Sequence, residues 1–440
     1  MSDEIRDFVF AQPIFDGHEH LWTLPEFAKE QTYASICGYA GADLLVARGP
    51  RPPASENLPP VEKAEHKSAY FSAWRLARNT GYCQATERAC RDLLGLEYTE
   101  ENADSVTAKL NALKGADPVA FYRGNLRDKA GVRWAIKDAI HSPEDVAEGN
   151  YPRDLVRVNY RDDALLCIRT AEAILERERR WNRSIHTLDD LTDGLRASMS
   201  ACFATGMVTA VKIGVAYQRR LDFTNPPKSD AERAFNRLME RGSGRPQGSL
   251  SVAQPADDEL RPLHDWLTHQ FVRHATDEGK VVQIHTGYLA GVFNDLRNVD
   301  PLALVPLILT YRGTRFELFH AGWPYCDVLG TMGKHYPNVW LSMVWAWTMN
   351  PITMERTLDA WLDGVPMNKI VGFGGDTHHP ICTYGYAVQA REGIARTLQA
   401  RIDRGAMDAA LAREAARSIL LTNGCQLHGL PVSRGVPLLP

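Results

Sequence analysis

Two histidines near the N-terminus, His18 and His20, are the residues best placed to do chemistry together. They follow the apolar run Pro13-Ile14-Phe15, which indicates a buried strand. Alternate residues of a strand point to the same face, so we expect both imidazoles to face one way. Two neutral ring nitrogens at one strand end can bind a single metal ion, which suits a hydrolase or lyase site.

The same pattern, an apolar run that ends on one residue of a metal-binding type, recurs three times further along the chain. The segments are 281–285, 316–320 and 370–376, which end on His285, His320 and Asp376. If these runs are parallel strands of one barrel, their last residues meet at one face. We therefore predict one divalent ion, with Zn²⁺ preferred and Mn²⁺ or another divalent ion as the alternative. The predicted ligands are His18, His20, His285 and Asp376.

Asp376 and His320 are the side chains expected to act on the substrate. Asp376 is suited both to bind the ion and to accept a proton from water, and His320 is suited to carry a proton or to stabilise developing negative charge. Plainer interpretations stay open. A lone histidine at a strand end is usually a hydrogen-bonded structural residue, and Asp376 follows two glycines, where a helix N-cap also fits.

Lys212 lies inside an apolar run, 208–213, and needs an anionic partner there. The sequence leaves three interpretations open: binding of a substrate carboxylate, carboxylation of the lysine to bridge two metal ions, or an ordinary ion pair with a barrel acid. Other candidates for substrate contact stand near predicted strand ends or in the loops after them. They are Arg157, Tyr217, Arg219, Trp323 and His378.

Short β-branched or aromatic runs alternate with helical patterns along the chain, which predicts parallel βαβ units. The first run ends at His20, and the others are 131–137, 155–160, 208–213, 281–285, 315–320, 339–343 and 370–375. This number of runs indicates an α/β fold, a (β/α)8 TIM-type barrel that forms a single domain over residues 1–440. The carboxyl ends of all its strands lie at one face, where the candidate residues are expected to meet.

Two segments exceed a minimal barrel. Residues 22–130 separate the first two predicted strands and carry helical patterns, so we predict a large inserted helical subdomain that covers the barrel mouth. Residues 219–256 contain several glycines and prolines and predict a lid or mobile loop after the fourth strand.

Composition limits the function classes. With 440 residues, 44% of them hydrophobic, the chain can bury a large core. The net charge is only −4 and no long run of one sign occurs, so we expect a small-molecule substrate and neither nucleic acid nor a membrane as partner. Eight cysteines without a Cys-x-x-Cys pair, and an N-terminus without a signal-peptide pattern, predict a cytoplasmic protein. Association into a homo-oligomer stays open.

Four motifs resemble the metal motifs of the amidohydrolase superfamily, in the branch called amidohydrolase family 2. They are His18-Glu-His20, Ile-His285-Thr-Gly, Phe-His320-Ala-Gly-Trp-Pro and Phe-Gly-Gly-Asp376. The C-terminal segment 419–430 also resembles the closing helix of that family, and 211–219 is similar to the amidohydrolase domains fused to glutamine-synthetase-like proteins. Uronate isomerases look like more distant relatives.

The resemblance implies that His18, His20, His285 and Asp376 bind one ion and that His320 contacts substrate or activated water. Two departures affect the choice of reaction. Lys212 stands in Val-Lys-Ile-Gly, unlike the Lys-Leu/Ile-His-Pro of decarboxylase-like members. Asp376-Thr-His-His replaces the Thr-Asp-Ser-Arg of uronate isomerases.

We therefore predict a metal-dependent hydrolase that directs metal-activated water at a carbonyl-type carbon of a small, carboxylate-bearing substrate. A non-oxidative metal-dependent decarboxylase and a uronate-type sugar-acid isomerase are the alternatives. A protein that binds a metabolite without converting it is a further class, and the presence of four ligand-type residues together with His320 argues against it.

Overall fold

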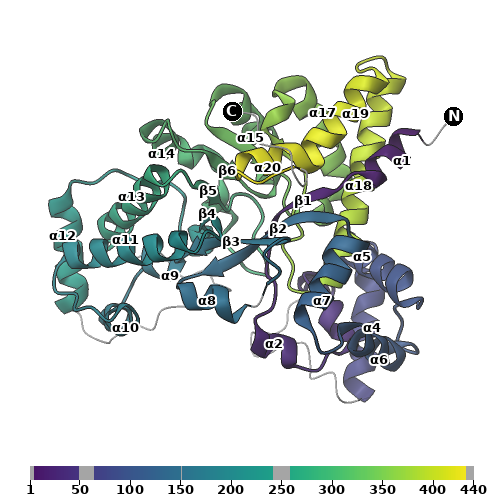
Figure 1. Ribbon diagram of the computed structural model, residues 1–440, viewed down its shortest axis with the longest axis horizontal. Helices are drawn as coiled ribbons and strands as arrows, with labels where there is room; N and C mark the ends of the chain where they lie inside the picture. The colour runs from purple at the N-terminus through teal and green to yellow at the C-terminus, as the bar shows by residue number, and fades with distance from the viewer. Residues whose placement is uncertain (1–3, 49–63, 150, 241–257, 433–440) are drawn as a thin grey trace.

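Parallel strands form the centre of the molecule and follow one another around it in chain order (Figure 1). This computed structural model describes residues 4–48, 64–149, 151–240 and 258–432. In that part of the chain eight strands make one sheet. They are β1 (Ile14–Glu19), β2 (Val132–Ile140), β3 (Val156–Arg161), β4 (Val208–Ile213), β5 (Val281–Ile284), β6 (Phe316–Leu318), β7 (Val339–Ser342) and β8 (Ile370–Val371).

Backbone hydrogen bonds join the segment after β8 to β1 and bring the two ends of the sheet together. The donor and acceptor pairs are Gly17 N and Phe373 O at 3.1 Å, Asp376 N and His18 O at 2.7 Å, and His20 N and Thr377 O at 3.1 Å. Together with the strand order, these contacts confirm the TIM-type barrel predicted from the sequence.

Helices precede, connect and follow the strands of the barrel. They are α1 (Glu4–Ala11), α8 (Pro143–Glu148), α9 (Asp163–Leu166), α10 (Ala171–Trp181), α11 (Leu188–Ala204), α12 (Lys228–Glu240), α13 (Arg261–Asp277), α14 (Val305–Thr310), α15 (Cys326–His335), α16 (Ala346–Met349), α17 (Pro351–Gly364), α18 (Pro380–Asp403), α19 (Ala409–Arg417) and α20 (Asn423–Leu427). Helix α11 shows why they form. Thr187 and Asp190 cap each other's backbone at its start, and Leu191 and Leu195 lie on its buried face.

The large helical insertion after β1 is confirmed. Its helices gather on one side of the molecule in Figure 1: α2 (Leu24–Ala28), α3 (Ala40–Ala47), α4 (Ala64–Ala77), α5 (Gly81–Ala89), α6 (Ala103–Lys114) and α7 (Pro118–Tyr122). The insertion packs tightly on α16, because a Cβ atom at Gly81 would lie 2.3 Å from the carbonyl oxygen of Thr348. Nearby, the ring of Tyr39 lies 4.4 Å from that of Trp345, between centroids.

The barrel interior has an apolar layer and a polar layer. At the amino ends of the strands, Phe15, Trp134 and Ile136 pack with residues of the C-terminal segment, including Leu421 and Leu427. This packing places α20 across that end of the barrel. Closer to the carboxyl ends, buried polar side chains of β3, β5 and β6 bond to one another: Asn159 Nδ2 donates to Gln283 Oε1 at 3.1 Å, and Gln283 Nε2 donates to Glu317 Oε2 at 2.9 Å.

Some strand boundaries differ from the expectation. Strand β2 continues to Ile140 instead of ending at Lys137, and β8 is shorter than 370–375. Strand β3 ends at Arg161, so Arg157 is its second residue and lies at the amino end. Of the predicted lid, 219–256, the structure describes the part up to residue 240, which includes helix α12, whereas 241–257 lie outside the described residues.

Candidate metal centre

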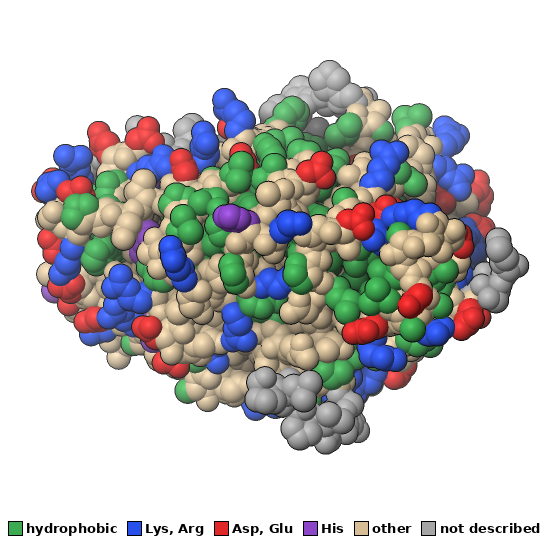
Figure 2. Space-filling view, turned by 90° about the horizontal axis from the view of Figure 1, so that it is seen from above, with side chains coloured by type: hydrophobic (Ala, Val, Ile, Leu, Met, Phe, Trp, Pro, Cys, Tyr) green, Lys and Arg blue, Asp and Glu red, His purple; other side chains and the backbone are tan. Residues whose placement is uncertain are grey.

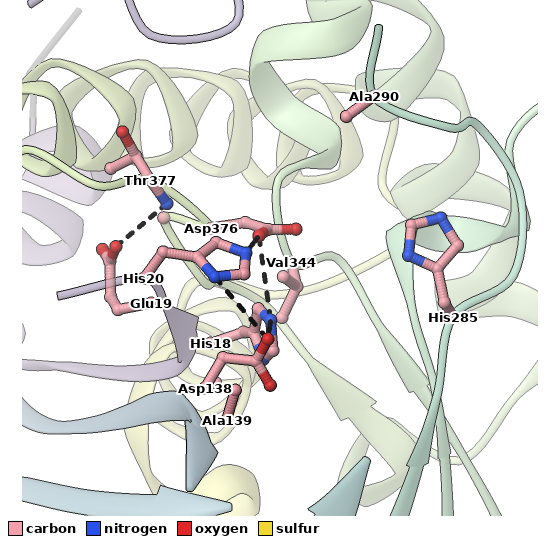
Figure 3. Close-up of polar contacts among 12 residues, drawn as sticks. His18, Glu19, His20, Asp138, Ala139, His285, Ala290, Val344, Asp376 and Thr377 are labelled. Atoms are coloured by element: carbon pink, nitrogen blue, oxygen red, sulfur yellow. Dashed lines mark hydrogen bonds and ion pairs between the residues drawn. The ribbon is translucent and has the colours of Figure 1, made fainter. Parts of the chain in front are cut away.

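His18 and His20 stand at the carboxyl end of β1, with their ring centres 5.1 Å apart (Figure 3). His18 is buried, and 24% of the His20 side chain is exposed, so solvent reaches the pair at His20. Burial lowers the pKa of His18 well below its ordinary value, which leaves a neutral imidazole able to bind a metal ion. Both rings contact the same two carboxylates, those of Asp138 and Asp376.

Asp376 contacts three imidazoles at once. Its Oδ1 lies 2.9 Å from His20 Nε2 and 3.8 Å from His18 Nε2, and its Oδ2 lies 3.8 Å from His320 Nε2. Burial raises the pKa of the Asp376 carboxyl, but the neighbouring His18 and His20 outweigh that effect and hold it well below its ordinary value. The side chain is therefore an ionised carboxylate at neutral pH.

Asp138 is the second carboxylate of this group, and the sequence analysis missed it. Its Oδ2 lies 3.6 Å from His18 Nε2 and 3.6 Å from His20 Nδ1, and it accepts a hydrogen bond from Arg161. The ligand atoms of His18, His20 and Asp138 all lie within 4.8 Å of one another, a spacing that suits one metal ion. Burial raises the pKa of Asp138, but Arg161 and His18 hold it well below its ordinary value.

His285 and His320 follow β5 and β6 and face each other, with His285 Nδ1 3.0 Å from His320 Nε2. Their other ring nitrogens bond to the carbonyl oxygens of Tyr288 and Val344, which can only accept, so those nitrogens carry the protons. In neutral rings the two facing nitrogens then present lone pairs to each other. Burial lowers the pKa of His285 well below its ordinary value and that of His320 to about 4, so no extra proton separates them at neutral pH.

A cation bound between these nitrogens would remove this conflict between lone pairs, and the donors around them fit a divalent metal ion. The group offers neutral imidazoles and ionised carboxylates, a mixture typical of zinc, manganese and iron sites. His285 is nevertheless set apart from His18, His20 and Asp138 (Figure 3), and neither of its nitrogens contacts them. Its place as a ligand of the same ion stays a prediction.

Lys212 lies buried beneath this group. Its Nζ sits 3.4 Å from the centre of the Phe319 ring and has no hydrogen-bond partner in the described part of the chain. Burial lowers its pKa to about 7, although Asp138 and Asp376 oppose that effect.

Two more of the proposed substrate contacts, Tyr217 and His378, lie against histidines of the group. The ring of Tyr217 is 5.0 Å from that of His285, and its hydroxyl accepts from the backbone N–H of Ala290. The exposed His378 stacks on His20 at 4.9 Å. Trp323 is half-buried and its ring lies 5.2 Å from that of Tyr288.

Arg157 and Arg219 do not join the group. The guanidinium of Arg157 lies 4.6 Å above the Trp134 ring, in the apolar layer at the amino end of the barrel, which corrects its placement near the end of β3. Arg219 is buried and pairs with Asp265 at 2.7 Å, so its charge is already neutralised. The arginine that does reach the candidate site from β3 is Arg161.

The sequence analysis missed Tyr39 and Asp138 for identifiable reasons. The Tyr39 hydroxyl lies 3.4 Å from Asp376 Oδ1, but it comes from the insertion, whose path over the barrel no local pattern reveals. Asp138 had a signal, since Trp134, Ile136 and Asp138 are alternate residues and the first two face the barrel interior. Because the predicted strand ended at Lys137, Asp138 was not recognised as its next inward-facing residue.

Comparison with known proteins shows the family of this chain. A family model described as amidohydrolase matches residues 188–426. Protein fluG of Emericella nidulans is 27% identical over 241 residues, which are 53% of this chain but only 27% of fluG, so the chain spans about a quarter of that relative's length. None of the helices that the structure describes has the length and hydropathy needed to cross a bilayer.

Two solved structures share the fold over nearly the whole chain. The glucuronate isomerase of Caulobacter crescentus superposes with a TM-score of 0.74 at 17% identity, covering 97% of this chain and 93% of its own. The uronate isomerase of Thermotoga maritima gives a TM-score of 0.76 at 14% identity, with 97% and 96% covered. Since the family model covers more than half of the residues, this chain belongs to the amidohydrolase family of metal-dependent enzymes.

Proposed function

We propose that this protein is a metal-dependent hydrolase that attacks a carbonyl-type carbon of a small, carboxylate-bearing substrate with water. One observation carries the proposal: the buried, ionised Asp376 carboxylate contacts His18 and His20 through one oxygen and His320 through the other. A single carboxylate can thus serve the metal ligands on one side and a proton transfer on the other.

In the proposed site His18, His20 and Asp376 hold one divalent ion, with Zn²⁺ preferred, and His285 completes the set expected for the family. When bound, the ion supplies Lewis-acid activation of water and of the substrate carbonyl. Asp376 accepts the proton of the attacking water. His320, whose Nδ1–H donates to Val344 O, presents a lone pair at Nε2 that accepts a hydrogen bond from the attacking water and so orients it.

Lys212 is the proposed partner for the substrate carboxylate, because it is the buried cation of this site that lacks a hydrogen-bond acceptor among the described residues. Tyr217 and His378, whose rings lie against those of His285 and His20, are the proposed substrate contacts together with Trp323, and Arg161 stabilises Asp138. Basic and acidic side chains are interspersed on the face seen in Figure 2, which agrees with a small-molecule substrate and offers no basic patch there for nucleic acid.

The test is hydrolysis in ¹⁸O-enriched water of amides and lactones that carry a free carboxylate. We expect one ¹⁸O atom in the acid product, with activity lost on chelation and restored by Zn²⁺ or Mn²⁺. Release of carbon dioxide without label in the product would identify a decarboxylase instead. A protein that binds these compounds but converts none of them would contradict the enzyme proposal as a whole.

A sugar-acid isomerase is the second candidate, favoured by the likeness to two uronate isomerases over 97% of the chain. This reaction moves a proton between adjacent carbons, for which the Tyr39 hydroxyl, 3.4 Å from Asp376 Oδ1, is suitably close. The same assay with a uronic acid in deuterated water distinguishes the two reactions. An isomerase gives a product of the same composition that carries deuterium at carbon, and no ¹⁸O-dependent cleavage.

A further inference from the structure

The end of β2 contains one residue more than its neighbour β3. Lys137 pairs with Val158 and Ile140 with Tyr160, so three steps along β2 match two along β3. This is a β-bulge, a feature that bends a strand and re-aims its side chains beside active sites. It contains Asp138 and Ala139, and the φ angle of Ala139 is 61°. A left-handed alanine costs roughly 1–2 kcal/mol, so neighbouring groups must hold it in place.

Asn159 of β3 provides that hold. The backbone N–H of Ala139 donates to Asn159 Oδ1 at 2.9 Å, and Asn159 is fully buried. The orientation of the Asn159 amide is itself determined, because its Nδ2 donates to Gln283 Oε1 at 3.1 Å. Gln283 in turn donates from Nε2 to Oε2 of Glu317. Only one orientation of each amide satisfies this chain of hydrogen bonds.

The carboxylate that this bulge presents still has a free oxygen. Asp138 Oδ2 accepts from Arg161 and faces both His18 and His20. Asp138 Oδ1 is buried and has no hydrogen-bond partner in the described part of the chain. A buried carboxylate oxygen without a donor is costly unless a cation binds it, so a metal bond would satisfy this oxygen.

We propose that Asp138 is a ligand of the metal ion and that Asn159 is a positioning residue for it. Asn159 holds Ala139 in the left-handed turn and thereby aims the Asp138 carboxylate at His18 and His20. The inference rests on the proposed function, since it requires the metal centre. It assigns to β2 a ligand beyond the histidines and aspartate expected from β1, β5 and β8.

The test measures metal affinity of the metal-free protein, by calorimetric titration with Zn²⁺ and by the visible absorption of bound Co²⁺. Asn159→Ala should bind about 10- to 100-fold more weakly, as expected for the loss of a group that orients a ligand. Asp138→Asn should lose at least as much. Asn125→Ala is the matched control: Asn125 is also buried and donates to a backbone carbonyl, that of Phe121, but in the insertion. It should lower the melting temperature and leave the affinity unchanged.

A rescue variant separates positioning from general stability. Glycine adopts a positive φ at no steric cost, so Ala139→Gly added to Asn159→Ala should restore most of the lost affinity. Ala135→Gly, at a different alanine of β2, should restore none. If Asn159→Ala and Asp138→Asn bind metal as tightly as the wild type, or if Ala139→Gly rescues nothing, the inference is wrong and the proposed function stands. If the wild type binds no divalent ion, both fail.

Discussion

Asp376 Oδ1 lies 2.9 Å from His20 Nε2, and this contact couples the end of β8 to the end of β1 at the candidate metal centre. The backbone also joins the two strand ends, since Asp376 N donates a hydrogen bond to His18 O at 2.7 Å. Asp376 is itself left-handed, with a φ of 51°. Such strain, at roughly 1–2 kcal/mol for a residue with a side chain, is common at functional sites where the carboxylate direction matters.

The first prediction concerns this carboxylate. Asp376→Asn keeps the shape of the side chain but removes its charge, so we expect weaker Zn²⁺ binding and a loss of turnover of at least about 100-fold, as for the removal of a catalytic acid–base group. Metal content and initial rates check it. Asp189→Asn, at an exposed ion pair with Lys228, is the control and should match the wild type. Normal turnover by Asp376→Asn would remove Asp376 from the mechanism.

The strands were predictable where the chain is apolar on both faces. The run 208–213 coincides with β4 (Val208–Ile213), because a parallel barrel buries both sides of its strands and leaves a continuous apolar signature. The insertion was predictable for a similar reason, because the segment between the first two strands shows helical periodicity. Both patterns involve residues close together in the chain, so they can be recognised from one sequence alone.

The missing parts of the site depend on contacts between strands. Arg157, Asn159 and Arg161 alternate on one face of β3, and only the start of the strand decides which of them reaches the open end. Asp138 interrupts an apolar pattern and is tolerated because Arg161 approaches from β3 and His18 from β1. No segment of β2 read alone contains those partners.

The second prediction uses the ionisation of Lys212. Burial lowers its pKa to about 7, so its ammonium can hold a substrate carboxylate below that pH and becomes neutral above it. We expect kcat/KM to fall by up to about tenfold per pH unit above pH 7, and Lys212→Met to lack this decline and to have a raised KM. Lys369→Met is the control, since Lys369 is also buried against an aromatic ring, that of Trp340, far from the site. If kcat/KM of Lys212→Met declines above pH 7 as in the wild type, another group causes the decline.

The third prediction concerns the closed end of the barrel. A Cβ atom at Gly424 would lie 2.0 Å from Cδ1 of the buried Phe15, so Gly424→Ala must displace α20 or the Phe15 ring. We expect a loss of about 1–3 kcal/mol in unfolding free energy, typical of overpacking, with little change in kcat because the site lies at the other end. Urea denaturation measures it. Gly313→Ala, where an added Cβ meets nothing within 4 Å, should be close to neutral, and equal stability of the two variants would refute the steric argument.

The fourth prediction concerns acid stability. His379 caps α18, accepting from the backbone N–H of Ile381, and burial lowers its pKa to about 3. Because an unfolded histidine titrates near 6.5, only the unfolded state gains this proton between pH 6.5 and 3, and folding stability falls as the pH is lowered through that window. His379→Asn keeps a capping oxygen and cannot titrate, so its unfolding free energy should decline less, by up to about 1.4 kcal/mol per pH unit. Urea denaturation at pH 7 and 5 measures the difference.

His186→Asn is the control, because His186 is exposed and its replacement removes one surface histidine. If the unfolding free energies of both variants respond equally to pH, burial of His379 does not govern the acid response.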